Sequence, residues 1–135
     1  LSVFLRESQR VEITKRKITI IDSVGREVFH LNVDLGIVQW RISSPDGAKI
    51  AFAADGDGDF EIYVFDIINF KLTQLTHNTA WDDKPAWSPD GERIAFTSNQ
   101  TGNYEIYIMN SDGTRQTQLT FASGSEGSNS PAWQP

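Results

Sequence analysis

The sequence contains one motif twice, and its clearer copy, at residues 84–96, reads Lys84-Pro85-Ala86-Trp87-Ser88-Pro89-Asp90-Gly91-Glu92-Arg93-Ile94-Ala95-Phe96. Its Ser-Pro-Asp-Gly core is also present 44 residues earlier, at Ser44–Gly47. Two other segments recur at the same offset: Phe60–Tyr63 as Tyr104–Tyr107, and Gln74–Thr76 as Gln118–Thr120. A fixed period of about 20 to 50 residues indicates a repeat architecture. A further step of 44 residues back aligns Ile62 with Ile18, so residues 1–35 are interpreted as a degenerate first copy.

Each repeat is predicted to contain four short strands and no helix. In the third copy the period-2 alternation and the turn residues give strands at Lys84–Ser88, Arg93–Ser98, Tyr104–Asn110 and Arg115–Thr120. The proline and glycine of Pro89-Asp90-Gly91 form a turn, and the polar segment Asn99–Asn103 closes a hairpin. Four antiparallel strands in about 40 to 45 residues make one blade of a β-propeller, so the fold class is all-β.

The motif at residues 84–96, followed by Tyr104-Glu105-Ile106-Tyr107, resembles the repeat of the TolB-like β-propellers, which are related to the WD-repeat propellers. The resemblance covers residues 44–133 and extends to residues 1–43 only by register. It implies a non-catalytic propeller that binds or scaffolds a protein or peptide, and an extracytoplasmic location, periplasmic or secreted. The alternative it leaves open is an accessory or gating propeller cut from a larger hydrolase, such as a prolyl-oligopeptidase-like peptidase.

The predicted blades span residues 1–35, 36–80 and 81–127, followed by a latch strand at residues 128–135. Leu1–Leu5 is interpreted as a second strand and Glu7–Lys15 as a long charged hairpin, so the first blade is expected to lack its inner strand. Ser130–Trp133 resembles a spare first strand. The first strand of the second blade is expected to be bulged, because Trp40 lies farther from its turn than Trp87 does.

Three blades are too few for a closed ring, which usually needs about four to eight. We therefore expect a homodimer in which each chain donates its C-terminal strand to the first blade of the other, closing a six-bladed ring. The alternative is a longer chain with further blades. Since residue 1 is Leu and the only methionine is Met109, we expect the chain to be a processed or excised piece.

Most of the recurring residues are expected to be structural. The turn residues Pro45, Asp46, Gly47, Pro89, Asp90 and Gly91 suit tight backbone turns. Trp87 and Trp133 each follow Pro-Ala and are predicted to pack between blades, and Trp40 is expected to do the same.

The segments that connect one blade to the next are the expected binding surface, because such loops line the channel mouth of a propeller. The candidate residues are His77, Trp81, Asp82, Asp83, Glu126 and Asn129. A weaker candidate is a calcium loop at Asp55, Asp57 and Asp59, whose alternating carboxylates suit a hard cation. Phe60 stands where an EF-hand needs glycine, so a plain acidic hairpin is favoured, and neither a metal nor another cofactor is expected.

Composition excludes several classes of function. The formal charge of −6, with 18 acidic and 12 basic residues, has the wrong sign for a nucleic-acid partner. Cysteine chemistry is excluded because the chain has no cysteine. There is no run of about 18 apolar residues, so membrane insertion is not expected. The two histidines, His30 and His77, fall in different blades, and no Gly-x-Ser-x-Gly elbow occurs, so the chain is not expected to be an enzyme.

Overall fold

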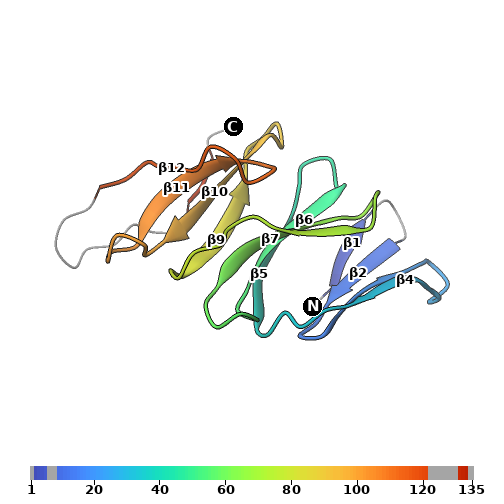
Figure 1. Ribbon diagram of the computed structural model, residues 1–135. Coiled ribbons are helices and arrows are strands. Elements are labelled where there is room, and N and C mark those ends of the chain that lie inside the picture. The colour runs from blue at the N-terminus through green and yellow to red at the C-terminus, as the bar shows by residue number, and fades with distance from the viewer. Residues whose placement is uncertain (1, 6–8, 122–130, 134–135) are drawn as a thin grey trace.

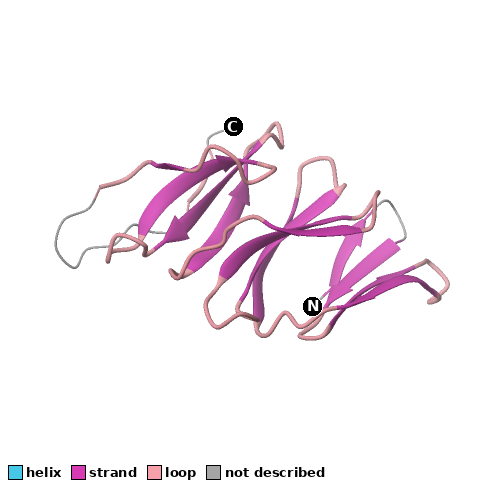
Figure 2. Ribbon diagram, in the orientation of Figure 1, coloured by secondary structure: helices cyan, strands magenta, loops and turns pink. Residues whose placement is uncertain are grey.

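In the computed structural model, which describes residues 2–5, 9–121 and 131–133, every regular element is a β-strand (Figures 1 and 2). Three four-stranded antiparallel sheets follow one another along the chain, each with its strands in sequence order. The first sheet consists of β1 (Ser2–Leu5), β2 (Gln9–Ile13), β3 (Lys17–Ile21) and β4 (Glu27–Asn32). The second consists of β5 (Val38–Ser43), β6 (Lys49–Ala54), β7 (Glu61–Asp66) and β8 (Lys71–Gln74). The third consists of β9 (Asp82–Trp87), β10 (Arg93–Ser98), β11 (Glu105–Asn110) and β12 (Thr117–Gln118). Within the described residues no helix is long and apolar enough to cross a membrane.

The core lies between the sheets, which stand face to face in chain order (Figure 1). One apolar cluster joins the first and second sheets through residues such as Val11, Ile18, Phe52 and Phe65. A second cluster joins the second and third sheets and includes Trp87. Because both of its faces are covered, β7 is buried from its first residue to its fifth, whereas β11 alternates between buried and half-buried positions. This is the packing of consecutive propeller blades, and it confirms the predicted fold class.

The second and third repeats carry the same bulge in their first strand. The register of β5 against β6 shifts between Gln39 and Ile42, and Trp40 has a φ of 59°. The register between β9 and β10 shifts in the same place, and there Lys84 has a φ of 53°. The predicted irregularity at Trp40 is therefore confirmed, and the third blade shares it.

The first blade differs from its predicted form. Gln9–Ile13 is a strand, not part of a long hairpin: Val11 and Ile13 are buried, while the outward-facing Arg10 and Glu12 form an ion pair of 3.3 Å. Ser2–Leu5 pairs with this strand at the edge of the sheet, in the position that β5 and β9 take in theirs. The first blade thus holds its own inner strand, and the expectation that it lacks one was wrong. A strand donated from another chain would find that position already occupied.

The Ser-Pro-Asp-Gly turns are built alike in the two repeats. The hydroxyl of Ser88 donates to Asp90 Oδ1 over 2.6 Å, and that carboxylate also accepts from the backbone N–H of Glu92 at 3.0 Å. These bonds hold the pKa of Asp90 below its ordinary value, the serine bond most of all. Ser44 and Asp46 repeat the arrangement at 2.7 Å.

The tryptophans divide into two kinds. Trp87 is buried between the second and third sheets, and its Nε1–H donates to the carbonyl of Ile42 over 3.0 Å. Trp133 makes the corresponding bond to the carbonyl of Ala86 at 2.9 Å and lies 5.3 Å from the Arg93 guanidinium. Trp40, by contrast, is exposed and sits under the Lys84 ammonium at 5.5 Å. The expectation that Trp40 packs between blades was wrong, because the bulge turns it outward.

Candidate functional site on the linker face

Both segments that connect one sheet to the next lie at the same end of the molecule, which we call the linker face. It comprises the linkers 33–37 and 75–81 and the hairpin loops 55–60 and 99–104. Each linker is tied to the hairpin of the sheet it enters. Asp55 Oδ1 accepts from the Ile37 N–H at 2.6 Å, and the Asp55 N–H donates to the Ile37 carbonyl at 3.2 Å. Asn99 and Trp81 repeat both bonds, at 2.8 and 3.3 Å. We call this pair of bonds the linker clamp.

The linker clamps present one apolar side chain each to solvent. Ile37 is 60% exposed and Trp81 is 46% exposed, and the two occupy equivalent positions in consecutive repeats. Trp81 is also fixed by an edge contact to Phe60, with the ring centroids 5.1 Å apart. A half-exposed indole held at its backbone and at one edge loses little conformational freedom when it binds a partner.

The predicted rim residues do not all face solvent. His77 is exposed, with Nε2 3.1 Å from the Gln74 carbonyl. Asp83 is buried, where it accepts from the Gln39 side chain and the Lys84 N–H, and burial raises its pKa. Asp82 is fully buried. Glu126 and Asn129 lie outside the described residues.

Four carboxylates from two sheets meet beneath this face. Asp57, Asp59 and Glu61 can each offer one oxygen such that all three oxygens lie within 4.8 Å of one another. Asp82, at the start of β9, is beside Glu61. Asp55 does not belong to this cluster, because its Oδ1 is held by the linker clamp. The predicted trio of Asp55, Asp57 and Asp59 is therefore replaced by an acidic cluster of Asp57, Asp59, Glu61 and Asp82.

Glu61 is the residue of this cluster that the sequence analysis missed. Its carboxyl group accepts from Thr76 Oγ1 at 2.9 Å and from the Asn78 N–H at 2.9 Å. Burial and the neighbouring Asp82 raise the pKa of Glu61 to about 9. Glu61 therefore keeps its proton at neutral pH. The sequence signal that could have identified Glu61 is its recurrence as Glu105. That recurrence, however, indicates only an equivalent position in a strand, not membership of an acidic cluster.

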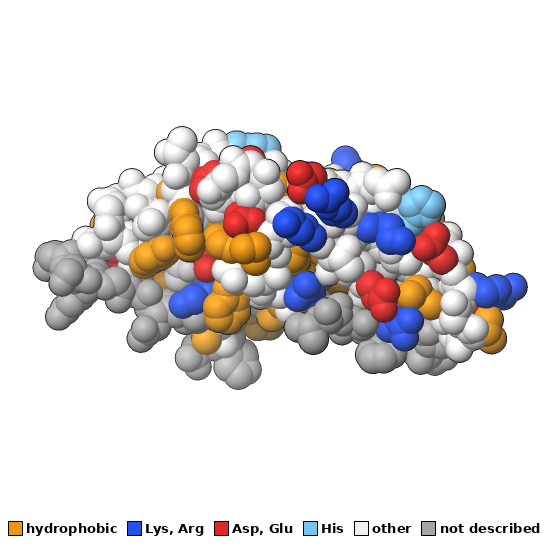
Figure 3. All heavy atoms as spheres, turned by 90° about the horizontal axis from the view of Figure 1, so that it is seen from below, with side chains coloured by type: hydrophobic (Ala, Val, Ile, Leu, Met, Phe, Trp, Pro, Cys, Tyr) orange, Lys and Arg blue, Asp and Glu red, His pale blue; other side chains and the backbone are white. Residues whose placement is uncertain are grey.

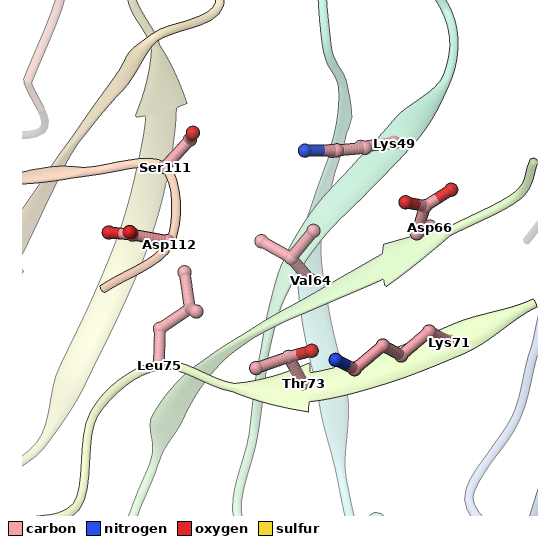
Figure 4. Close-up of a pocket in the computed structure, with 8 residues that line it drawn as sticks. All are labelled: Lys49, Val64, Asp66, Lys71, Thr73, Leu75, Ser111 and Asp112. Atoms are coloured by element: carbon pink, nitrogen blue, oxygen red, sulfur yellow. The ribbon is translucent and has the colours of Figure 1, made fainter. Parts of the chain in front are cut away.

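A separate hollow of about 310 Å³ opens at the opposite end of the second sheet (Figure 4). Lys49, Asp66 and Lys71 line it from the second sheet, and Ser111 and Asp112 face them from the turn between β11 and β12. Its charges are mixed and balanced, and none of the residues predicted from the sequence lies there.

The comparisons with known proteins agree with this architecture. The family model of the TolB β-propeller domain matches residues 9–135. Among solved structures, the chain is similar to a putative TolB from Agrobacterium tumefaciens, with 28% identity and a TM-score of 0.67 over 89% of this chain and 45% of that chain. TolB from Acinetobacter baumannii has 24% identity and a TM-score of 0.63, over 93% of this chain and 33% of that chain. The β-propeller domain of Cps50 (Swd1) from Myceliophteria thermophila has 16% identity and a TM-score of 0.67, over 93% of this chain and 42% of that chain.

The chain spans less than half of each of these solved structures. No curated protein matches it.

Proposed function

Because the chain belongs to the TolB β-propeller domain family, we propose that it is a non-catalytic module that binds a protein or peptide segment on its linker face. The observation that carries this proposal is the repeated linker clamp, which presents Ile37 and Trp81 from consecutive blades. Aromatic side chains held in one orientation are the commonest anchors of protein interfaces. We further propose an extracytoplasmic location, periplasmic or secreted, which rests on family membership alone.

The chemistry of this face favours a particular kind of segment. Asp57 is exposed in the same hairpin loop as Phe60, whose ring contacts Trp81, and the whole chain carries a formal charge of −6. Figure 3 shows a face of the molecule on which hydrophobic side chains gather over one half. An extended segment with an apolar anchor and neighbouring Lys or Arg side chains would complement both features.

Replacement of Trp81 by alanine tests this proposal. Random peptides displayed on phage are selected on the folded chain, and their dissociation constants are measured by fluorescence polarisation. We expect the selected peptides to bind Trp81→Ala at least about tenfold more weakly, because the indole supplies the anchor. The matched control is Ile68→Ala, which removes an apolar side chain of similar exposure (45%) from the turn between β7 and β8, at the end of the second sheet opposite the linker face. Equal affinity for the wild type and Trp81→Ala, or a selection that yields no binder, would contradict the proposal.

We also propose that two copies complete a six-bladed ring, each contributing three whole blades without strand exchange. Tyr104 and Leu119 are exposed in the third repeat, whereas their equivalents in the second, Phe60 and Leu75, are buried in the cluster that joins the second and third sheets. Light scattering at several concentrations should give a mass near twice 15.1 kDa that does not change on dilution. A stable monomer, or a ladder of aggregates, would show that the remaining blades come from elsewhere.

A further inference from the structure

The hairpin between β6 and β7 arranges three carboxylates around one point. Asp57 and Asp59 flank Gly58, whose φ of 111° reverses the chain, and Glu61 begins the following strand. One oxygen from each lies within 4.8 Å of the other two. Oxygens bound to Ca²⁺ at about 2.3 to 2.6 Å are separated by at most about 4.6 to 5.2 Å, so small side-chain movements would bring all three onto one ion.

A fourth carboxylate, from another blade, provides an independent observation. Asp82 is fully buried, and although its Oδ2 accepts from the Asn78 side chain at 2.7 Å, its Oδ1 has no hydrogen-bond partner. The buried Oδ2 of Asp59 likewise has none. Asp82 lies against Glu61 and acts electrostatically on Asp59, so it adjoins the cluster from the next blade. Buried carboxylate oxygens without a donor are unfavourable unless a cation or a proton neutralises them.

The equivalent hairpin of the third blade shows which of these residues the fold itself requires. There Glu105 accepts from Thr120 Oγ1 at 2.6 Å, as Glu61 accepts from Thr76. The positions of Asp57 and Asp59, however, are taken by Thr101 and Asn103. The glutamate–threonine bond is therefore common to both blades, whereas the two aspartates are an addition to the second. The hairpin folds without them in the same molecule.

We propose that Asp57, Asp59, Glu61 and Asp82 bind one Ca²⁺ ion between the second and third blades. The ligand set contains only carboxylate oxygens, which select hard cations over Zn²⁺ or Cu²⁺. Mg²⁺ requires oxygens about 2.0 to 2.1 Å from the ion and a nearly ideal octahedron, for which an open hairpin and two buried strand residues from different blades are less suited. The exposed Asp57 leaves room for water to complete the coordination. The ion would join the hairpin of one blade to the first strand of the next.

Calorimetric titration of the EDTA-treated chain with CaCl₂ tests this proposal. We expect one Ca²⁺ per chain with a dissociation constant of about 10⁻⁴ M, together with a rise in melting temperature on addition of CaCl₂. MgCl₂ should bind at least about tenfold more weakly. The test variant is Asp57→Thr/Asp59→Asn, which gives the second hairpin the residues of the third. It should lose at least about tenfold in affinity and no longer gain thermal stability from CaCl₂.

The control is Glu92→Gln/Asp112→Asn, which removes the same number of charges from exposed positions outside the cluster and should bind Ca²⁺ as the wild type does. Far-UV circular dichroism in EDTA verifies that each variant is folded, and Asp59→Asn alone replaces the double variant if it is not. The absence of both a binding heat and a thermal shift in the wild type would overturn the proposal. So would equal affinity in the variant, or tighter binding of Mg²⁺ than of Ca²⁺.

Discussion

Replacement of Trp87 by alanine is expected to lower the free energy of unfolding by about 3 to 5 kcal/mol. The side chain is 7% exposed and belongs to the apolar cluster that joins the second and third sheets. Its removal would leave a cavity between two blades, and the surrounding strands can collapse only partly into it. The Ile42 carbonyl would also lose its hydrogen bond from Nε1, which spans the same junction at 3.0 Å. The measurement is urea unfolding followed by circular dichroism.

Trp40→Ala is the matched control for this variant, since it truncates the same side chain at an exposed position. The Trp40 ring is 48% exposed and contacts the Lys84 ammonium, so its loss should cost less than about 1 kcal/mol. A loss below about 1 kcal/mol for Trp87→Ala as well would mean that the junction between the blades does not depend on this ring.

The repeat explains why so much of the fold was predictable. A period of 44 residues aligns each strand of the second blade with one of the third, so that evidence for a strand in one copy supports the other. The bulge at Trp40 was predicted from its longer distance from the turn, but the third blade has the same bulge with Trp87 at the shorter distance, so that distance is not its cause. These features are local, and backbone preferences and alternation determine them.

The first blade was predicted less well because its residues have diverged from the motif. The strand Gln9–Ile13 was read as a charged hairpin, since Arg10 and Glu12 dominate its composition. The alternation of buried Val11 and Ile13 with these two residues was the available signal for a strand. If this alternation had been given more weight than the charges, Gln9–Ile13 would have been predicted as the second strand of the blade, and Ser2–Leu5 as its first.

The acidic cluster depends on contacts that the sequence does not show. Asp55 resembles a metal ligand in sequence, but its side chain is used by the linker clamp to Ile37, 18 residues away. Glu61 and Asp82 are 21 residues apart and belong to different sheets. A single acidic residue in a strand is usually solvent-exposed, so only the packing of the two blades reveals that both are buried.

Replacement of Gly36 by alanine is expected to cost about 3 kcal/mol or more in the free energy of unfolding. Gly36 has a φ of 67°, in the left-handed region that side chains disfavour. A Cβ there would overlap Asp55 Oδ1 and lie 2.9 Å from the Gly56 nitrogen. Asp55 cannot move away from this Cβ without breaking its 2.6 Å bond to the Ile37 N–H. The added methyl group and the linker clamp therefore cannot both be accommodated.

Gly47→Ala separates these two effects, because Gly47 has nearly the same φ, 72°, but no atom within 4 Å of the added Cβ. Gly47→Ala should lower the free energy of unfolding by about 1 to 2 kcal/mol, the cost of the backbone conformation alone. Thermal and urea unfolding of both variants measure the difference. If the two variants lose the same free energy of unfolding, the linker shifts to accommodate the new methyl group and the linker clamp is flexible. If Gly36→Ala loses at least about 1 kcal/mol more, the clamp is rigid. A rigid clamp is what the linker face needs in order to present Ile37 in a fixed position to a partner.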